Sequence, residues 1–277
     1  MEAELMNLES KMERLQPTTN ISEHSTTLRI ALLVADTPPA NVVEQHGDYT
    51  KIFPEMLRKA IALSGRNIKV EWENFDVTKM QYPSEHSGFQ GIILSGSAAS
   101  AASDEPWIFH LNEYLKQLIT DVPECKLVGV CFGHQLIARA MGGTVAKNKK
   151  GWEIGLTEVQ LNTAGKKLLK TNRDSLKLQQ VHQDIVTYSP PGLEVLCSSN
   201  LCEVQAMLKP NHIFTIQGHP EFTPSIVEEI TRFKEKAGSL SPELANEVYQ
   251  QLNVSDDSIW LAKKIMEFMM GGFIEEN

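Results

Sequence analysis

The 277-residue sequence contains 26 basic and 35 acidic side chains, which give a formal net charge of −9. This acidic balance argues against a nucleic acid or an anionic membrane as the main partner, and no apolar window reaches the roughly 18 residues that a membrane span needs. The four cysteines form no disulfide framework and no zinc-binding spacing, and the acidic N-terminus lacks the regions of a signal peptide. We therefore expect a cytoplasmic protein with reduced thiols, and a nuclear location stays open.

The first 27 residues are expected to form a separate N-terminal segment. Apolar residues between positions 1 and 16 recur largely at alternating spacings of four and three, which predicts one short amphipathic helix. Residues 17–27 are polar and turn-rich, which predicts a linker. Residues 28–277 would then form a single domain.

The first half of this domain alternates strand-like and helix-like segments. Residues 28–35 are apolar at all but one position, which is typical of a strand buried on both faces of a parallel sheet. One helix is predicted to end at Ser64–Gly65 and another to follow Asp104. Further strands are predicted at 68–75, 89–94 and 126–130. This alternation predicts an α/β fold with a doubly wound, mostly parallel sheet, in which ligands bind at the carboxyl ends of the strands.

The second half has shorter strand candidates that Pro, Gly and Asn residues separate. We expect them to form a small antiparallel section that joins or flanks the main sheet. The candidates span residues 154–161, 193–197, 203–208 and 212–217, with a hairpin turn at 208–211. Helices are predicted at 225–237, 241–252 and 255–270, the last with Ser255 as its N-cap.

Cys131 stands where a strand turns abruptly into a helix. Gly129 and Gly133 flank it, and an apolar helical pattern follows at once. This is the pattern of a nucleophile elbow, which exposes the sulfur at the carboxyl edge of a sheet and at a helix N-terminus. The alternative is a buried free cysteine that closes a core strand, because free cysteines are among the most buried residues.

A thiolate nucleophile needs a base, and the base needs an orienting group. His219 ends an apolar strand directly after a glycine, and Glu221 falls on the same side two residues later if the chain stays extended. The carboxylate could then accept from one ring nitrogen while the other nitrogen faces the sulfur. An ordinary surface turn is the alternative.

A loop of small residues, Ser95-Gly96-Ser97, follows the strand that ends at Leu94. Backbone N–H groups in such a loop can receive the oxyanion of an acyl-transfer reaction, and the Phe132 amide is the natural second donor. An ordinary turn at the end of a strand explains the loop equally well.

Three further polar residues have open roles. His134 lies one helical turn after Cys131, and helix geometry directs it away from the sulfur, so we expect it to pack or to lie at the rim. Gln135 could pack under the elbow or contact a ligand, with the structural role favoured. His182 could shape a substrate pocket or satisfy a loop. The sequence contains no phosphate-binding glycine motif and no two-His-one-carboxylate spacing, so we expect no cofactor and no metal.

Three stretches together resemble the motifs of the class I (triad) glutamine amidotransferase family: Gly129-Val-Cys131-Phe-Gly133-His-Gln135, Gln217-Gly-His219-Pro-Glu221 and Ile92-Ile-Leu-Ser-Gly-Ser97. Their order and separation also fit, and the resemblance covers roughly residues 28–270. It implies a flavodoxin-like fold, Cys131 as nucleophile, His219 as base and acid, and Glu221 as the orienting group. It also implies an oxyanion hole formed by the amides of Ser97 and Phe132.

One departure marks a subgroup, because this loop has Ser-Gly-Ser where many members have Ser-Gly-Gly. With Trp107 and residues 151–155 and 181–184, the chain resembles the stand-alone fungal amidotransferase-like proteins and the plant γ-glutamyl peptidases. That resemblance implies that the last two segments, which contain Glu153 and His182, help to hold the γ-glutamyl group. Gly96 and Gln135 are further candidates for substrate contacts.

The resemblance implies a cysteine-dependent hydrolase that attacks a small-molecule γ-glutamyl substrate. One hypothesis is an amidotransferase-like hydrolase that serves an unidentified acceptor or a separate synthetase, since we expect 277 residues to leave no room for a synthetase domain. A second hypothesis is a γ-glutamyl peptidase that acts on glutathione-like conjugates. A third is a non-catalytic binding protein that kept the fold. In a related superfamily of stress-response proteins and proteases, the histidine directly follows the cysteine, whereas here Phe132 does.

Overall fold

The computed structural model describes residues 26–84 and 88–273. The helix expected over residues 1–16 and most of the linker expected over 17–27 lie outside the described residues. The last two linker residues, Thr26 and Thr27, already belong to the first strand, because they pair with Ile68 and Lys69 of the neighbouring strand. The strand therefore begins two residues earlier than predicted.

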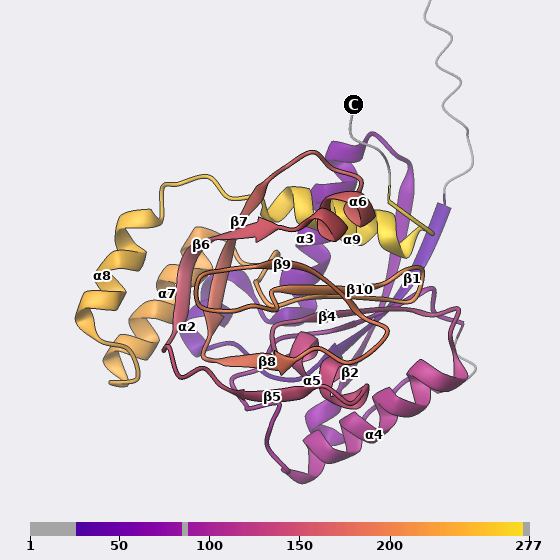
Figure 1. Ribbon diagram of the computed structural model, residues 1–277, viewed down its shortest axis with the longest axis horizontal. Coiled ribbons are helices and arrows are strands. Elements are labelled where there is room, and N and C mark those ends of the chain that lie inside the picture. Colours follow the sequence, from indigo (N-terminus) through magenta and orange to yellow (C-terminus); the bar gives the residue numbers. More distant parts are fainter. Residues whose placement is uncertain (1–25, 85–87, 274–277) are drawn as a thin grey trace, which may run out of the picture.

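The main sheet has nine strands in the order β2-β1-β3-β4-β11-β10-β9-β6-β7 (Figure 1). The first five of these strands run parallel to one another. They are β2 (Ile68–Asp76), β1 (Thr26–Val34), β3 (Gly91–Leu94), β4 (Lys126–Val130) and β11 (Ile213–Ile216). The predicted α/β class with a mostly parallel sheet is confirmed for this half.

Helices cover both faces of the parallel strands, because each strand alternates its buried side chains between two separate cores. Leu28, Ile30 and Leu32 of β1 pack into one core with the helices of the first face, while Ala31 and Leu33 pack into the other. The first face carries α3 (Tyr49–Ser64), which ends at Gly65 with φ +66°, and α9 (Ser258–Met269). The second face carries α4 (Pro106–Asp121) and α5 (Phe132–Ala140).

The antiparallel section joins the main sheet rather than flanking it. Its strands continue the sheet beyond β11. These strands are β10 (Ala206–Lys209), β9 (Glu194–Ser198), β6 (Glu153–Leu161) and β7 (Ser175–His182). The strands β10 and β11 form the hairpin that was predicted from residues 208–211, with Asn211 at φ +60°. A separate two-stranded sheet pairs β5 (Thr144–Lys147) with β8 (Asp184–Tyr188).

Several of these elements differ from the predictions. The strands β5, β7 and β8 were missed, and β7 contains Gln179, Gln180 and His182, polar side chains that hide its strand pattern but are buried. Two short helices were also missed, α2 (Ala40–His46) and α6 (Thr163–Leu169), as was the 3-10 turn η2 (Val77–Lys79).

The three C-terminal helices were predicted nearly as they occur. They are α7 (Pro224–Lys236), α8 (Pro242–Gln251) and α9. The expected N-cap of α9, Ser255, is wrong, because the helix begins at Ser258 after Asp257. The Asp257 carboxylate accepts from the Lys177 N–H and from Arg173, each over 2.8 Å, and so ties the start of α9 to β7. Along the described part of the chain, no helix is long and apolar enough to span a bilayer.

Candidate active site

Cys131 is the single residue between β4 and α5. It has φ +51° and ψ −105°, a backbone conformation that is rare for a residue with a side chain and costs about 1–3 kcal/mol. Two backbone hydrogen bonds hold it there: its N–H donates to Ile216 C=O over 2.9 Å, and its C=O accepts from the Gln135 N–H over 3.1 Å. The geometry is that of a strained turn from a strand into a helix N-terminus, where the helix dipole attracts negative charge.

The two glycines beside Cys131 are required by close packing. A Cβ at Gly129 would lie 2.6 Å from the Gly133 carbonyl oxygen, and a Cβ at Gly133 would collide with the Leu94 carbonyl oxygen. The start of α5 therefore packs directly on the backbone of β3 and β4. The elbow at Cys131 and the loop that follows Leu94 therefore lie close together.

We expect Gly133→Ala to destabilise the fold by at least the 1–3 kcal/mol that overpacking typically costs, because the new methyl group would meet a backbone oxygen. Chemical denaturation of the variant and the wild type measures the difference. Gly91→Ala is the control, since there the new Cβ would meet only the flexible Met269 side chain, at 3.2–3.3 Å. Equal losses from both substitutions would contradict this explanation.

His219 and Glu221 form a buried pair just after β11. The Nδ1 of His219 lies 2.8 Å from Glu221 Oε1, and its ring stacks on Phe222 with centroids 4.1 Å apart and planes 1° apart. The His219 N–H donates to the Gln179 carbonyl over 2.8 Å, which fixes the backbone to β7. Within the described chain the Nε2 of His219 has no hydrogen-bond partner. One ring nitrogen is therefore oriented by the carboxylate and the other is left for the sulfur or a substrate.

His219 also interacts electrostatically with Cys131. Burial lowers the pKa of His219, but the negative charges of Glu221 and Cys131 outweigh burial and hold this pKa well above its ordinary value. A Cβ at Gly96 would lie 3.0 Å from His219 Cε1 and 3.6 Å from Cys131 Cβ. Gly96 therefore lies against both side chains, which brings the predicted loop, nucleophile and base together.

The loop after β3 is held by a residue from the end of β1. Asp36 accepts from the Ala98 N–H over 2.7 Å through one carboxylate oxygen and from the Thr37 N–H over 2.7 Å through the other. The Ser97 hydroxyl lies 3.5 Å from the first of these oxygens. The amides of Ser97 and Phe132, the predicted oxyanion donors, have no acceptor among residues 26–84 and 88–273.

We expect Asp36→Ala to lower kcat by up to about 100-fold with a smaller change in KM, because the loop would lose its anchor while the donor itself remains. Steady-state kinetics on a γ-glutamyl substrate measures this split. Asp104→Ala is the control, because Asp104 is an exposed partner of Arg139. A pure rise in KM would show instead that Asp36 only binds substrate.

Cys131, His219 and this loop line one cavity of about 270 Å³. Cys131 is only 5% exposed, so the cavity is its route to a ligand. Apart from Asp36 and Thr37, the remaining wall is mostly apolar, with one cation and one phenol. The lining residues are Asp36, Thr37, Pro38, Pro39, Tyr49, Ser97, Ala98, Cys131, Val181, His219, Phe222, Ile230, Phe233 and Lys234.

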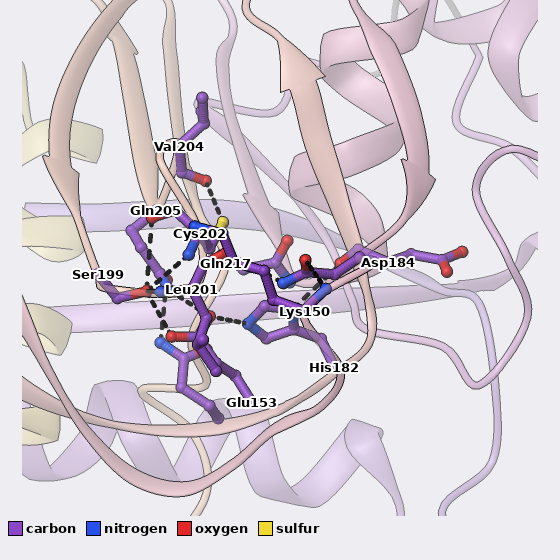
Figure 2. Close-up of polar contacts among 12 residues, drawn as sticks. Lys150, Glu153, His182, Asp184, Ser199, Leu201, Cys202, Val204, Gln205 and Gln217 are labelled. Atoms are coloured by element: carbon purple, nitrogen blue, oxygen red, sulfur yellow. Dashed lines mark hydrogen bonds and ion pairs between the residues drawn. The ribbon is translucent and has the colours of Figure 1, made fainter.

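Three of the residues predicted to contact substrate lie elsewhere, in a buried polar network. Figure 2 shows two of them, Glu153 and His182. His182 Nε2 lies 3.0 Å from Glu153 Oε2, which also accepts from Gln205 Nε2 over 2.8 Å. Gln135 donates through Nε2 to the Asp184 carbonyl over 2.7 Å and to Gln217 Oε1 over 2.9 Å. None of Gln135, Glu153 and His182 is among the residues that line the Cys131 cavity.

Strand geometry explains this placement. Val181 lines the cavity, and successive side chains of a strand point to opposite faces, so His182 points away from the cavity. Glu153 lies on the same face of the sheet as His182, because the two residues are register partners in β6 and β7. His134 is likewise buried, with Nδ1 2.9 Å from Thr215 Oγ1, and burial, assisted by the charge of His182, lowers the pKa of His134 to about 3.

Three ionisable residues at the cavity were not predicted from the sequence: Asp36, Tyr49 and Lys234. Asp36 carried a usable signal, because it follows the first strand and so lies at the carboxyl edge where ligands bind. Tyr49 and Lys234 carried none, since their helices reach the cavity only through tertiary packing. Within residues 26–84 and 88–273, no three His, Cys, Asp or Glu side chains gather in an arrangement that could hold a metal ion.

Comparisons with known proteins show which family the chain resembles in sequence. The family model described as glutamine amidotransferase class-I matches residues 46–234. A glutamine amidotransferase-like protein of Schizosaccharomyces pombe is 33% identical over 245 residues, which cover 87% of this chain and 98% of the relative. Gamma-glutamyl peptidase 3 of Arabidopsis thaliana is 32% identical over 209 residues, which cover 73% of this chain and 80% of the peptidase.

Solved structures extend the likeness to the fold. The crystal structure of a glutamine amidotransferase from Thermotoga maritima matches with a TM-score of 0.64 and 18% identity, covering 87% of this chain and 97% of the other. At this identity the likeness concerns the fold alone.

Proposed function

Because the chain belongs to the glutamine amidotransferase class-I family, we propose that it hydrolyses γ-glutamyl amide bonds with Cys131 as the nucleophile. The observation that carries this proposal is the shared cavity. It joins a strained cysteine at a helix N-terminus to a histidine whose other nitrogen is 2.8 Å from a buried carboxylate. A nucleophile, a base and an orienting group are the parts that thiol acyl transfer needs.

The first half of the reaction forms a thioester. The Cys131 thiolate attacks the γ-carbonyl carbon, and the oxyanion receives hydrogen bonds from the Ser97 and Phe132 amides. Protonated His219 donates its proton to the nitrogen of the leaving group, the C–N bond breaks, and the amine departs. The γ-glutamyl group is then bound to the sulfur.

The second half returns the enzyme to its starting state. Neutral His219 removes a proton from a water molecule, which attacks the thioester carbonyl. The C–S bond breaks, glutamate leaves, and the thiolate and the imidazolium are restored together. The raised pKa of His219 favours this paired ionic state, in which Glu221 stabilises the imidazolium.

Two forms of this activity differ in the leaving group. An amidotransferase-like hydrolase releases ammonia from glutamine, which an unidentified acceptor enzyme would use. A γ-glutamyl peptidase releases an amino acid or a peptide. The similarity to gamma-glutamyl peptidase 3 over most of both chains supports the second form as a specific candidate.

Turnover by the isolated protein separates the two forms. Glutamine and γ-glutamyl-cysteinyl conjugates are compared by kcat/KM under the same conditions. Appreciable ammonia release from glutamine without a partner supports the amidotransferase-like form, and cleavage of the conjugates with negligible glutamine turnover supports the peptidase. No turnover of either, together with no reaction of Cys131 with a γ-glutamyl-mimicking electrophile, would overturn the proposal and favour a binding protein.

A further inference from the structure

Helix α7 forms one wall of the cavity that contains Cys131. It begins after Thr223, whose hydroxyl accepts from the Ile226 N–H over 3.3 Å. Ile230, Phe233 and Lys234 all line the cavity, and their spacing of three and four residues places them on one face of the helix. A wall that carries a cation therefore faces the nucleophile.

Contacts with α2 hold this helix in place. The Asn41 side chain donates through Nδ2 to Glu229 Oε2 over 2.6 Å and to the Glu229 carbonyl over 3.1 Å. The His46 ring nitrogen Nε2 lies 3.1 Å from Ser225 Oγ. Figure 1 shows α2 and α7 in the same part of the molecule. The position of Lys234 is therefore set by a supported helix and not by a free loop.

Lys234 has no carboxylate partner in the part of the chain that the structure describes. Its Nζ lies 4.6 Å from the centroid of the Trp152 ring, a cation–π contact that restricts where the ammonium can point. The one acidic residue among the described lining residues is Asp36, and both of its oxygens accept backbone N–H groups. The positive charge of Lys234 is thus left without an ion pair.

The surroundings of Lys234 make this unpaired charge significant. Lys234 is half-buried, and this burial lowers its pKa. The negative charges of Cys131 and Asp36 oppose the effect of burial but do not outweigh it. A partly desolvated cation without a partner is unfavourable and is stabilised when an anion binds. The adjoining wall from Phe222, Ile230 and Phe233 is apolar. The cavity is therefore suited to a ligand with an aliphatic body and a carboxylate.

We propose that Lys234, oriented by Trp152, binds a carboxylate of the substrate and selects γ-glutamyl compounds that carry it. This inference rests on the proposed γ-glutamyl hydrolysis. The carboxylate has two sources with the same chemistry, the α-carboxylate of the glutamyl group and a carboxylate on the leaving group. Lys234 acts as a specificity residue, and the chemical step stays with Cys131 and His219.

The first test compares matched substrates with the wild type, Lys234→Met and Lys234→Arg. The substrates are γ-glutamyl-glycine, its glycinamide analogue and its α-methyl ester. A charge-assisted hydrogen bond to a carboxylate predicts that Lys234→Met lowers kcat/KM for γ-glutamyl-glycine by about 10- to 100-fold, while Lys234→Arg keeps most of it. The analogue that is insensitive to Lys234→Met identifies the carboxylate. The ratio of kcat/KM between the acid and each analogue is taken within one variant, so a partly unfolded sample does not change it.

Lys236→Met is the matched control, because Lys236 lies on the same helix, is exposed, and does not line the cavity. It is expected to leave all three substrates unchanged. An equal effect of Lys234→Met on the acid, the amide and the ester would overturn the carboxylate site.

The second test needs no γ-glutamyl turnover. Iodoacetate is anionic and iodoacetamide is neutral, and the alkylation rate of Cys131 by each is measured by mass spectrometry of the Cys131 peptide. Lys234→Met is expected to lower the iodoacetate rate several-fold relative to iodoacetamide, and Lys236→Met is expected to leave that ratio unchanged. If the wild type cleaves no γ-glutamyl compound, the proposed function fails, and this ratio still decides the anion site. An unchanged ratio in Lys234→Met overturns it.

Discussion

Cys131→Ser is expected to lower γ-glutamyl hydrolysis by about 10⁴- to 10⁶-fold, the range seen when the nucleophile of a catalytic triad is removed. The hydroxyl is a far weaker nucleophile than a thiolate and is not ionised beside His219. The strained backbone at φ +51° is retained, because serine has nearly the same size as cysteine. Release of free glutamate from a γ-glutamyl substrate, followed over time, measures the loss.

Cys125→Ala is the control for this substitution. Cys125 is also buried, but it precedes β4 and does not line the cavity that contains Cys131. We expect Cys125→Ala to retain activity within about twofold. A core substitution away from the cavity changes the stability of the fold and not the chemical step. Full activity in Cys131→Ser would show that another group performs the attack.

Glu221→Gln is expected to lower kcat by about 10²- to 10⁴-fold and to leave measurable activity, because His219 and the oxyanion donors remain. Glutamine can still occupy the site 2.8 Å from His219 Nδ1, but it carries no negative charge. The imidazolium that forms during turnover would then lack its buried counter-charge. Glu228→Gln is the control, because Glu228 forms an exposed pair with Arg232 on α7 and such pairs contribute little.

Glu221→Gln is also expected to change how the free energy of unfolding depends on pH. The pKa of His219 is raised in the folded state, so its contribution to the free energy of unfolding is complete below about pH 6.5 and is lost as the pH rises through the raised pKa. Removing the Glu221 charge should therefore cost more stability at about pH 6 than at about pH 9. Urea denaturation at both pH values measures this difference. An equal cost at both would mean that the charge of His219 is not what Glu221 stabilises.

Local patterns predicted the parallel half of the fold well. The apolar runs of β1 and β4 and the helices α3 and α4 depend on periodicity and on end signals such as Gly65, which neighbouring residues determine. The antiparallel half was harder to predict, because β7 contains Gln179, Gln180 and His182 in buried positions. These buried side chains find polar partners in residues from distant parts of the chain. Gln180, for example, donates to Gln205 Oε1 over 3.0 Å.

The substrate-contact predictions show the same limit within the site. The resemblance implied that Glu153 and His182 help to hold the γ-glutamyl group, and Gln135 was a candidate for either a structural role or a ligand contact. In the structure all three belong to a buried polar network and do not line the cavity. Lys234 lines the cavity although it lies fifteen residues beyond His219, on a helix that no motif marks. Which face of a strand or helix meets the cavity depends on register and packing.

By itself, the sequence determined the fold class and the candidate triad of Cys131, His219 and Glu221. Glycine spacing, strand-to-turn transitions and the two-residue separation of histidine and carboxylate are local features, and local sterics control them. Only the tertiary structure decided which residues surround that triad. The Asp36 anchor and the unpaired Lys234 come from elements far apart in the chain, and the cavity between them exists only once β1, β3, β4, β11 and α7 have packed together.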